Sequence, residues 1–418
     1  MATDSTLRFS AQTDEVTSLL RIVNLVRTGE ATTRPEIGDA TGLGRGVVTQ
    51  RIERATALGY LVDSDFGPSS GGRAPRTLRF QAERGRLVIC AIGALHIHVG
   101  LTELDGDVTA QAHRDWDISR GPDETIGVAL AMVDELLAEH PGAPIWGVGV
   151  GLPGPVDFAS GRPVAPPIMP GWNNVDVRGR IHAHLGAPTW VDNDVNLLTY
   201  GERARRHAVD GDLIYCKVGS GIGAGLLSGG RVHRGANGAA GDIGHVPVLG
   251  AETRCRCGKV GCLEAVASGW ALVRDVNAAI AAGEETSLAE VDPLTPEQIS
   301  LAAERGDGLA WKLSQTSARV VGDAIATLVN MFNPSVIVIG GAVAGVAGET
   351  YLAEVRQRVY ERSLPLATRD LRIEQSLNDV REPIRGGAEL LRERLFDASF
   401  ARWFADGRPT IEAIFPEG

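Results

Sequence analysis

Apolar side chains recur at helical spacing in short runs near the start of the chain. They return every three or four positions in residues 16–27 and again in residues 45–58, which predicts an amphipathic helix in each run. A helix between these two opens at Arg34-Pro35, because proline is tolerated in the first helical turn. Two short strand patterns follow, at residues 60–62 and 76–80. Three helices and a hairpin predict a winged helix-turn-helix domain over residues 1–82.

From about residue 87 the pattern changes to alternating strands and helices, which predicts an α/β fold. Residues 88–108 read as strand, glycine-containing loop, strand, turn and strand, and residues 213–232 repeat that order. The repeat predicts a duplicated hairpin unit in a two-lobed, actin- or hexokinase-like fold with a cleft between the lobes. The alternative is coincidence between two glycine-rich hairpins. We assign residues 83–400 to this domain and residues 401–418 to a C-terminal tail.

Composition places the chain among ordinary globular proteins. It has 418 residues, of which 44% are hydrophobic and 22% charged. The first residues are polar and no apolar run is long enough to cross a bilayer, so we expect a cytoplasmic protein without a membrane partner. Five cysteines in a reducing compartment are not expected to form disulfides.

Charge is distributed unevenly along the chain. The formal net charge is −11, yet residues 1–86 carry 12 arginines against 10 acidic residues. The rest of the chain is therefore strongly acidic. A small DNA-contacting head on an acidic body fits this asymmetry.

The third predicted helix has the side chains of a recognition helix. Its polar and basic residues are those that would face the major groove, where arginine pairs with guanine and glutamine with adenine. The candidate DNA contacts on this helix are Arg45, Thr49, Gln50, Arg51 and Arg54. Gly72 and Arg73, at the tip of the predicted wing, suit a minor-groove or phosphate contact. The alternative is a helical protein-interaction domain whose arginines form a solvated face.

One cysteine-rich segment has the spacing of a metal site. His245 precedes Cys255, Cys257 and Cys262, and three thiolates with one imidazole satisfy a tetrahedral Zn²⁺. Four protein ligands close the site, so the predicted zinc is structural. The alternative is a set of free cysteines near a surface loop. Cys90 and Cys216 stand in apolar strands and are interpreted as packing residues.

Further polar residues suggest a sugar pocket. Asn193-Asp194 follows a strand pattern, where the pair would hydrogen-bond vicinal hydroxyls and Asp194 would be placed to accept a proton. Asp242, His245 and Glu264 flank the zinc segment and would supply the other side, with the metal orienting His245. The loop Gly219–Gly225 would cradle phosphate through its backbone amides, or is a plain hairpin turn.

Taken together, these motifs resemble the ROK family of repressors, open reading frames and kinases, in its regulator branch with an N-terminal winged helix. The resemblance covers nearly the whole chain. It is carried by Thr33-Arg-Pro-Glu-Ile37, Gly71-Gly-Arg-Ala-Pro75, Gly151-Leu-Pro-Gly-Pro-Val-Asp157, Asn193-Asp194, Gly219-Ser-Gly-Ile-Gly223, the segment from Gly235 to His245, the cysteine run ending at Glu264, and Asn333 to Gly341.

The resemblance implies roles by position. Asn193, Asp194, Asp242, His245 and Glu264 fall on the family's sugar-contacting residues, and Asp194 falls on its catalytic base. The four predicted zinc ligands, His245, Cys255, Cys257 and Cys262, fall on the family's zinc ligands.

Departures from the family pattern favour a regulator over a kinase. The family's kinases begin their first phosphate loop with Asp followed by Gly-Gly-Thr, and here Ala91 and Leu95 take the places of the Asp and the Thr. Loss of one such electrostatic group costs about 10²–10³-fold in rate, so use of ATP and Mg²⁺ is not expected. Asp242 replaces the usual Glu, which shortens one sugar contact, and Gly44 replaces the usual Ser before the recognition helix, where it is a weaker N-cap.

We therefore predict a DNA-binding repressor of carbohydrate-related genes, acting as a homodimer or higher homo-oligomer and controlled by a sugar or sugar-phosphate effector without phosphotransfer. One alternative is an active sugar kinase, a hexokinase or glucokinase, with an added DNA-binding head. A second is a regulator whose body only docks a partner protein and whose pocket is vestigial.

Overall fold

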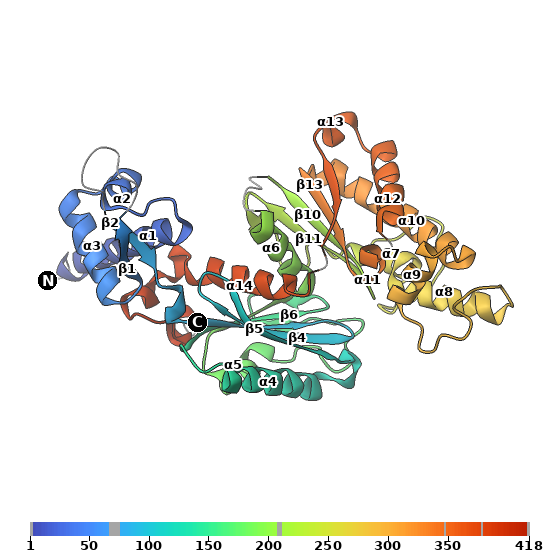
Figure 1. The fold of residues 1–418 in the computed structure, drawn as a ribbon, viewed down its shortest axis with the longest axis horizontal. Helices are drawn as coiled ribbons and strands as arrows, with labels where there is room; N and C mark the ends of the chain where they lie inside the picture. The colour runs from blue at the N-terminus through green and yellow to red at the C-terminus, as the bar shows by residue number, and fades with distance from the viewer. Residues whose placement is uncertain (1–2, 67–75, 207–210, 347, 378, 416–418) are drawn as a thin grey trace.

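The computed structural model describes residues 3–66, 76–206, 211–346, 348–377 and 379–415. An N-terminal head, two lobes and a C-terminal segment make up the fold (Figure 1). No helix in these ranges is long and apolar enough to cross a membrane.

The head contains the predicted three helices and hairpin. Its elements are α1 (Thr3–Thr28), α2 (Arg34–Thr41), α3 (Arg45–Ala57), β1 (Leu61–Phe66) and β2 (Arg76–Phe80). A capping box starts α2, in which the Thr33 side chain accepts from the Glu36 amide and the Glu36 carboxylate accepts from the Thr33 amide. Gly42 ends the same helix at a φ of 71°, in the left-handed region that glycine tolerates. The predicted winged helix-turn-helix is confirmed.

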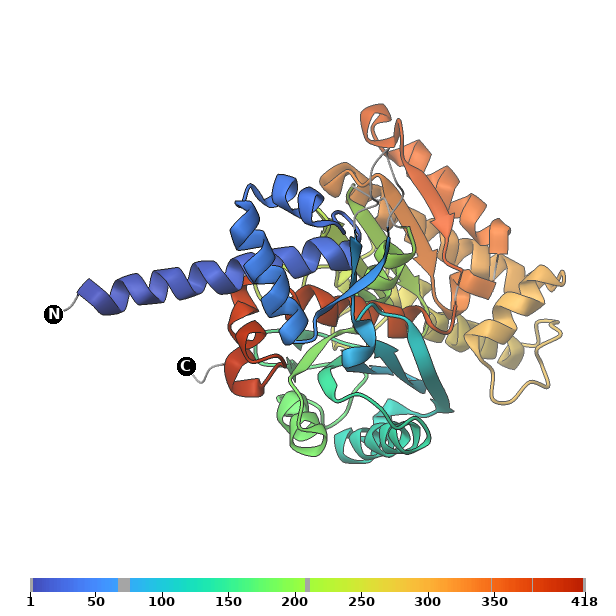
Figure 2. The same cartoon turned by 60° about the vertical axis from the view of Figure 1, so that its left-hand side comes forward.

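The first helix is longer than its apolar pattern. It begins at Thr3 and extends outward from the rest of the molecule (Figure 2). Its first residues are mostly polar in sequence, so hydrophobic periodicity carried no signal there.

Each lobe is built on a five-stranded mixed sheet, and the two sheets share one topology. The strand orders are β5-β4-β3-β6-β9 and β12-β11-β10-β13-β14. In the order given, the first three strands of each sheet pair antiparallel with one another. The fourth strand then pairs parallel with the third, and the fifth pairs parallel with the fourth. The predicted duplication of residues 88–108 and 213–232 is thus confirmed.

The strands of the first sheet are β3 (Arg86–Ile92), β4 (His96–Glu103), β5 (Val108–Asp115), β6 (Ile145–Leu152) and β9 (Thr189–Asn193). Those of the second are β10 (Leu213–Val218), β11 (Ile222–Ser228), β12 (Arg231–Val232), β13 (Val336–Gly340) and β14 (Arg372–Gln375). A small separate hairpin pairs β7 (Val156–Asp157) with β8 (Arg162–Pro163).

Helices cover both sheets. In the first lobe, α4 (Pro122–Glu139) and α5 (Val177–Leu185) lie on one face of the sheet, while α14 (Glu382–Leu395) lies on the other (Figure 1). Helix α6 (Asp194–Arg206) packs against α14 and against strands of both sheets. The second lobe carries α7 (Leu263–Ala267), α8 (Gly269–Ala281), α9 (Pro296–Glu304), α10 (Gly308–Phe332), α11 (Ala342–Val346), α12 (Gly348–Arg362) and α13 (Pro365–Thr368).

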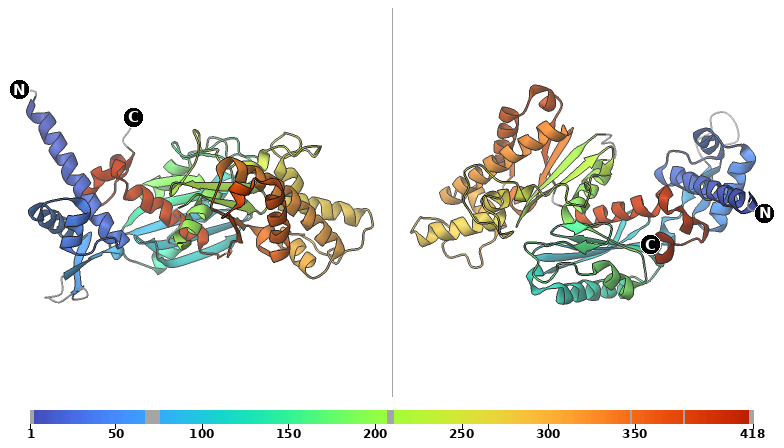
Figure 3. Two further views of the ribbon diagram at one scale, coloured as in Figure 1. Left: turned by 90° about the horizontal axis from the view of Figure 1, so that it is seen from above. Right: turned by 180° about the vertical axis from the view of Figure 1, so that it is seen from behind.

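The C-terminal segment joins the head to the first lobe. Helix α14 runs from between the lobes toward the head, and η4 (Ala398–Ala405) and α15 (Ile411–Ile414) follow it (Figures 1 and 3). Tyr60 of the head stacks on Phe404 with ring centroids 4.5 Å apart and donates a 2.9 Å hydrogen bond to its carbonyl oxygen. Trp403, Trp146 and Phe396 also belong to this buried aromatic cluster. Residues beyond 400, separated from the body in the sequence interpretation, therefore share its hydrophobic core.

Candidate functional site

A cavity of about 660 Å³ lies between the lobes and gathers the predicted sugar-contacting residues. Side chains from both sheets line it, as expected for a cleft at the interface of two lobes. All five candidates reach it: Asn193, Asp194, Asp242, His245 and Glu264.

Asn193 is fixed by local hydrogen bonds at the start of α6. Its Oδ1 accepts from the Val195 amide at 2.8 Å, which caps the helix, and its Nδ2 donates to the Gly154 carbonyl at 2.9 Å. The end of β9 and the loop after β6 thus hold this amide in one orientation.

The next residue, Asp194, forms an ion pair that the sequence interpretation missed. Its Oδ2 lies 2.5 Å from Nζ of Lys217 on β10, and both side chains are mostly buried. The ion pair holds the Asp194 carboxylate at the cleft, where its oxygens can accept hydrogen bonds.

The signal for Lys217 was present in the repeat. Cys216-Lys217 aligns with Cys90-Ala91, so the lysine stands where the first lobe has Ala91, and both residues line the cleft. A charged residue inside an otherwise apolar strand pattern could have marked it.

The remaining candidates meet at the opposite wall. Nε2 of His245 lies 3.9 Å from Oδ1 of Asp242, and the nearby Glu264 carboxylate accepts from the Ile222 amide at 3.2 Å. Burial raises the pKa of Glu264 above its usual value. Gly221 permits this approach, because a Cβ there would stand 2.4 Å from Oε2 of Glu264.

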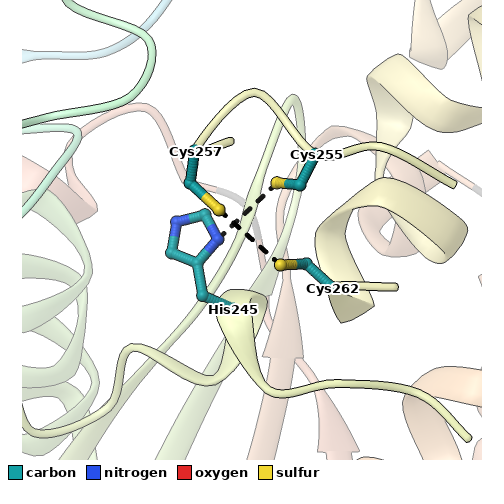
Figure 4. Close-up of side chains that lie close together, drawn as sticks. All are labelled: His245, Cys255, Cys257 and Cys262. Atoms are coloured by element: carbon teal, nitrogen blue, oxygen red, sulfur yellow. Dashed lines mark hydrogen bonds between the residues drawn. The ribbon is translucent and has the colours of Figure 1, made fainter. Parts of the chain in front are cut away.

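Behind this wall, the four predicted metal ligands come together (Figure 4). One ligand atom from each of His245, Cys255, Cys257 and Cys262 lies within 4.8 Å of all the others. The sulfurs of Cys257 and Cys262 are 3.7 Å apart, and Sγ of Cys255 is 3.8 Å from Nδ1 of His245.

These distances fit a tetrahedral zinc ion. Sulfurs bound at about 2.3 Å to one tetrahedral ion lie roughly 3.8 Å apart. Gly258 and Gly261, at φ of 89° and 76°, make the turns that bring the sulfurs together. With Nδ1 directed to the cluster, Nε2 of His245 remains on the cavity side, next to Asp242.

Residues at the end of β3 and in the loop after it also line the cavity. Ala91, at the end of β3, lines the cavity with a methyl group, and Leu95 is exposed at 53%. His96 and His98 line the same region, and the His96 ring lies against Gly93. Neither histidine entered the sequence prediction.

The predicted DNA contacts on α3 have different surroundings. Arg45, Thr49 and Gln50 are exposed. Arg51 turns toward α1, where its guanidinium lies 2.9 Å from Oε1 of Glu15 and from Oγ of Ser18, which leaves its side chain 13% exposed.

Exposed Arg54 donates a 3.4 Å hydrogen bond to the Ala405 carbonyl. Gly72 and Arg73 lie outside the described residues. The DNA-contacting roles on α3 and the wing stay predictions.

Comparison with known proteins shows which family this architecture is similar to. The model of the ROK family matches residues 88–394. A xylose repressor of Caldicellulosiruptor bescii is 29% identical over 363 residues, which cover 85% of this chain and 90% of the relative. A glucokinase of Halalkalibacterium halodurans is 32% identical over 282 residues, covering 65% of this chain and 83% of the relative.

A solved structure extends the likeness into the head. The structure of a ROK family transcriptional regulator, a homologue of the Escherichia coli MLC protein, matches with a TM-score of 0.79 at 27% identity and covers 92% of this chain and 98% of its own. Residues 88–418 alone make up a smaller share of the chain than this, so the structural match must include residues of the head. The glucokinase match is shorter and covers a smaller share of this chain.

Proposed function

This chain belongs to the ROK family, and on that premise we propose that it is a transcriptional regulator that binds DNA through its head and a sugar through its cleft without phosphorylating it. The observation that carries the proposal is the contrast between the two sides of one cavity. The sugar side keeps five polar candidates, whereas the phosphate side offers Ala91 where the family's kinases have Asp. Regulators among the compared proteins also match over more of the chain than the glucokinase does.

DNA binding is assigned to the exposed face of α3. Arg45 and Gln50 can read base edges in the major groove, and Thr49 lies between them. Arg51 would act indirectly, because its ion pair with Glu15 ties the recognition helix to α1. We propose that two heads of a homodimer read the two halves of a palindromic operator upstream of carbohydrate-related genes, as a repressor.

Ligand binding is assigned to Asn193, Asp194, Asp242, His245 and Glu264. Their carboxylates, amide and imidazole can form hydrogen bonds with the hydroxyl groups of a sugar or sugar derivative. The ordered Asn193 amide and the paired Asp194 carboxylate fix two of these contacts before the ligand arrives, which reduces the entropy lost on binding.

A zinc ion would be held by His245, Cys255, Cys257 and Cys262, and it would supply structural cross-linking. The four protein donors leave no open coordination position for catalysis. The cysteines then fix the orientation of the His245 ring toward the cavity.

Absence of phosphotransfer follows from two residues. Ala91 provides no oxygen to position a metal or water. Lys217 holds the carboxylate that a kinase would use as its base. The duplication relates these two positions, because Lys217 on β10 aligns with Ala91 on β3.

Signal transfer is assigned to α14 and the segment after it. Glu382, at the N-terminal end of α14, lines the cleft. At the other end, the carbonyl of Phe396 accepts a 3.0 Å hydrogen bond from Nδ2 of Asn24 in the head. A ligand that favours one arrangement of the lobes therefore acts on a helix attached to the head, provided that its affinity differs between the two states.

The test uses purified full-length protein and DNA from upstream of its own and neighbouring genes. Fluorescence anisotropy should show specific binding that depends on α3, so that Gln50→Ala weakens the specific complex by roughly 5- to 100-fold. Glu53→Ala, at an exposed residue of the same helix, is the control. Absence of specific DNA binding would overturn the proposal.

The alternative function, an active sugar kinase, is tested by an assay for sugar phosphate. ATP-dependent formation of a sugar phosphate, abolished by Asp194→Asn, would establish a kinase and overturn the assignment of Ala91 and Lys217. No product with any aldopentose or hexose, together with heat of sugar binding in calorimetry, supports the sensor.

A further inference from the structure

Three histidines lie together on β4 and β5, away from the zinc cluster. The strands pair antiparallel, with His98 opposite His113 and His96 opposite Asp115. Alternate residues of a strand share one face, so these four side chains form a two-by-two array on one face of the sheet. Only nine histidines occur in the chain, and three of them are in this array.

This face is the one that looks toward the cleft. His96 and His98 line the cavity, whereas the intervening Ile97 belongs to the hydrophobic core under α4. Further along β4, Gly100 lies on the same face and packs closely on Ile384 of α14. The array therefore borders the phosphate side of the cavity, next to the loop that contains Gly93.

The spacing of His98 from each of its two neighbours fits coordination of one metal ion, whereas the outer rings, His96 and His113, are farther apart. The ring centroids of His98 and His113 are 4.5 Å apart, those of His96 and His98 are 4.9 Å apart, and those of His96 and His113 are 6.3 Å apart. An imidazole bound through one nitrogen at about 2.1 Å has its centre roughly 3.2 Å from the ion. Two such rings at right-angled to tetrahedral positions then have centres roughly 4.5–5.2 Å apart.

Two of the imidazoles, those of His96 and His98, are in the chemical state that a metal requires. Burial lowers the pKa of His96 and of His98 to about 4, so both rings are neutral at neutral pH and keep a free lone pair. The nitrogens of the three rings are not gathered as closely as the ligand atoms around His245, which all lie within 4.8 Å of one another. His113 is 50% exposed, so its side chain can rotate without a change in the backbone.

We propose that His96, His98 and His113 form a second metal site, for a divalent ion of the Zn²⁺, Ni²⁺ or Cu²⁺ class, with Asp115 as a carboxylate partner of His113. Imidazole ligands favour these ions over Mg²⁺ or Ca²⁺. Oδ1 of Asp115 lies 3.6 Å from Nε2 of His113, close enough to orient the ring or to join the ion. The ion would place positive charge on the side of the cleft where Ala91 supplies no ligand.

Nickel titration of the full-length protein, with zinc already bound at the cysteine site, tests the proposal. Isothermal calorimetry should show one saturable Ni²⁺ site per chain, and Mg²⁺ should give no heat. His98→Asn, which removes the central ring, should weaken Ni²⁺ binding at least tenfold, and His113→Asn should do the same from an exposed position. Electron paramagnetic resonance of added Cu²⁺ should show nitrogen couplings that His98→Asn removes.

A matched control is available on the first lobe. His184 is an exposed histidine with its own carboxylate neighbour, Asp134, at 2.9 Å. His184→Gln should change the Ni²⁺ affinity less than twofold. Unaltered thermal midpoints of the histidine variants exclude unfolding as the cause of a loss. Absence of a saturable site in the parent protein, or equal Ni²⁺ affinity in the parent and a folded His113→Asn variant, would overturn the proposal.

Discussion

Replacement of one buried glutamate should make the protein more stable, and more so as the pH rises. Glu382 starts α14 at the edge of the cleft and is only 7% exposed. Its Oε2 accepts a 3.0 Å hydrogen bond from Oγ of Ser376. Burial, and then the nearby carboxylate of Glu202, raise the pKa of Glu382 to about 8.

The sign follows from comparing the two states. An unfolded glutamate ionises near its ordinary pKa of 4.5, whereas the folded protein keeps the Glu382 proton until about pH 8. The folded state therefore loses stability as the pH rises through this window, because only the unfolded chain releases its proton. At about 1.4 kcal/mol per pH unit, the loss at pH 7 is about 3 kcal/mol.

Glu382→Gln keeps the shape and an acceptor for Ser376 but cannot ionise. We expect its free energy of unfolding to equal that of the parent near pH 4.5 and to exceed it by about 3 kcal/mol at pH 7. Urea unfolding at several pH values measures this difference. Glu297→Gln, at an exposed glutamate that lines the same cleft, is the control for removal of a carboxylate there. A Glu382→Gln variant whose stability difference from the parent does not change with pH would refute the reasoning.

Three further substitutions have defined outcomes. Cys257→Ser should release zinc, measured by elemental analysis, and lower the thermal midpoint; a variant that keeps one zinc per chain at full stability contradicts the assigned ligand set. Lys217→Met leaves the Asp194 carboxylate unpaired and should cost about 1–3 kcal/mol in urea unfolding without creating kinase activity, so unchanged stability argues against the ion pair. Tyr60→Phe removes the hydrogen bond to Phe404 and should cost about 1–2 kcal/mol while reducing the effect of sugar on DNA affinity; an undiminished sugar response would exclude this contact from the signalling route.

Spacing and repetition in the sequence predicted much of the site. The cysteine run constrains three sulfurs through local turns, so the cluster with His245 could be expected from the spacing of its ligands alone. The strand-loop-strand repeat predicted two equivalent lobes, because its glycines and apolar residues stand in register. These features are local in sequence or are repeated in it.

What the sequence did not reveal depends on long-range contacts. The Lys217–Asp194 pair joins β10 to α6, and no local pattern connects them. Packing of Phe404 on Tyr60 brings together residues more than 300 positions apart. The histidine array depends on the register of β4 with β5, since a shift by one residue would turn the side chains of one strand to the opposite face.

Operator affinity with and without sugar, measured together with phosphotransfer on one preparation, tests the central claim most directly. Anisotropy titrations with upstream DNA, at saturating xylose or glucose and with a panel of other sugars and sugar phosphates, should show at least one ligand that changes the Kd for DNA about tenfold. This change corresponds to a coupling free energy of about 1.4 kcal/mol. The same sample with ATP and Mg²⁺ should form no sugar phosphate. Sugar-dependent ATP turnover, or DNA affinity that no sugar alters, would contradict the account.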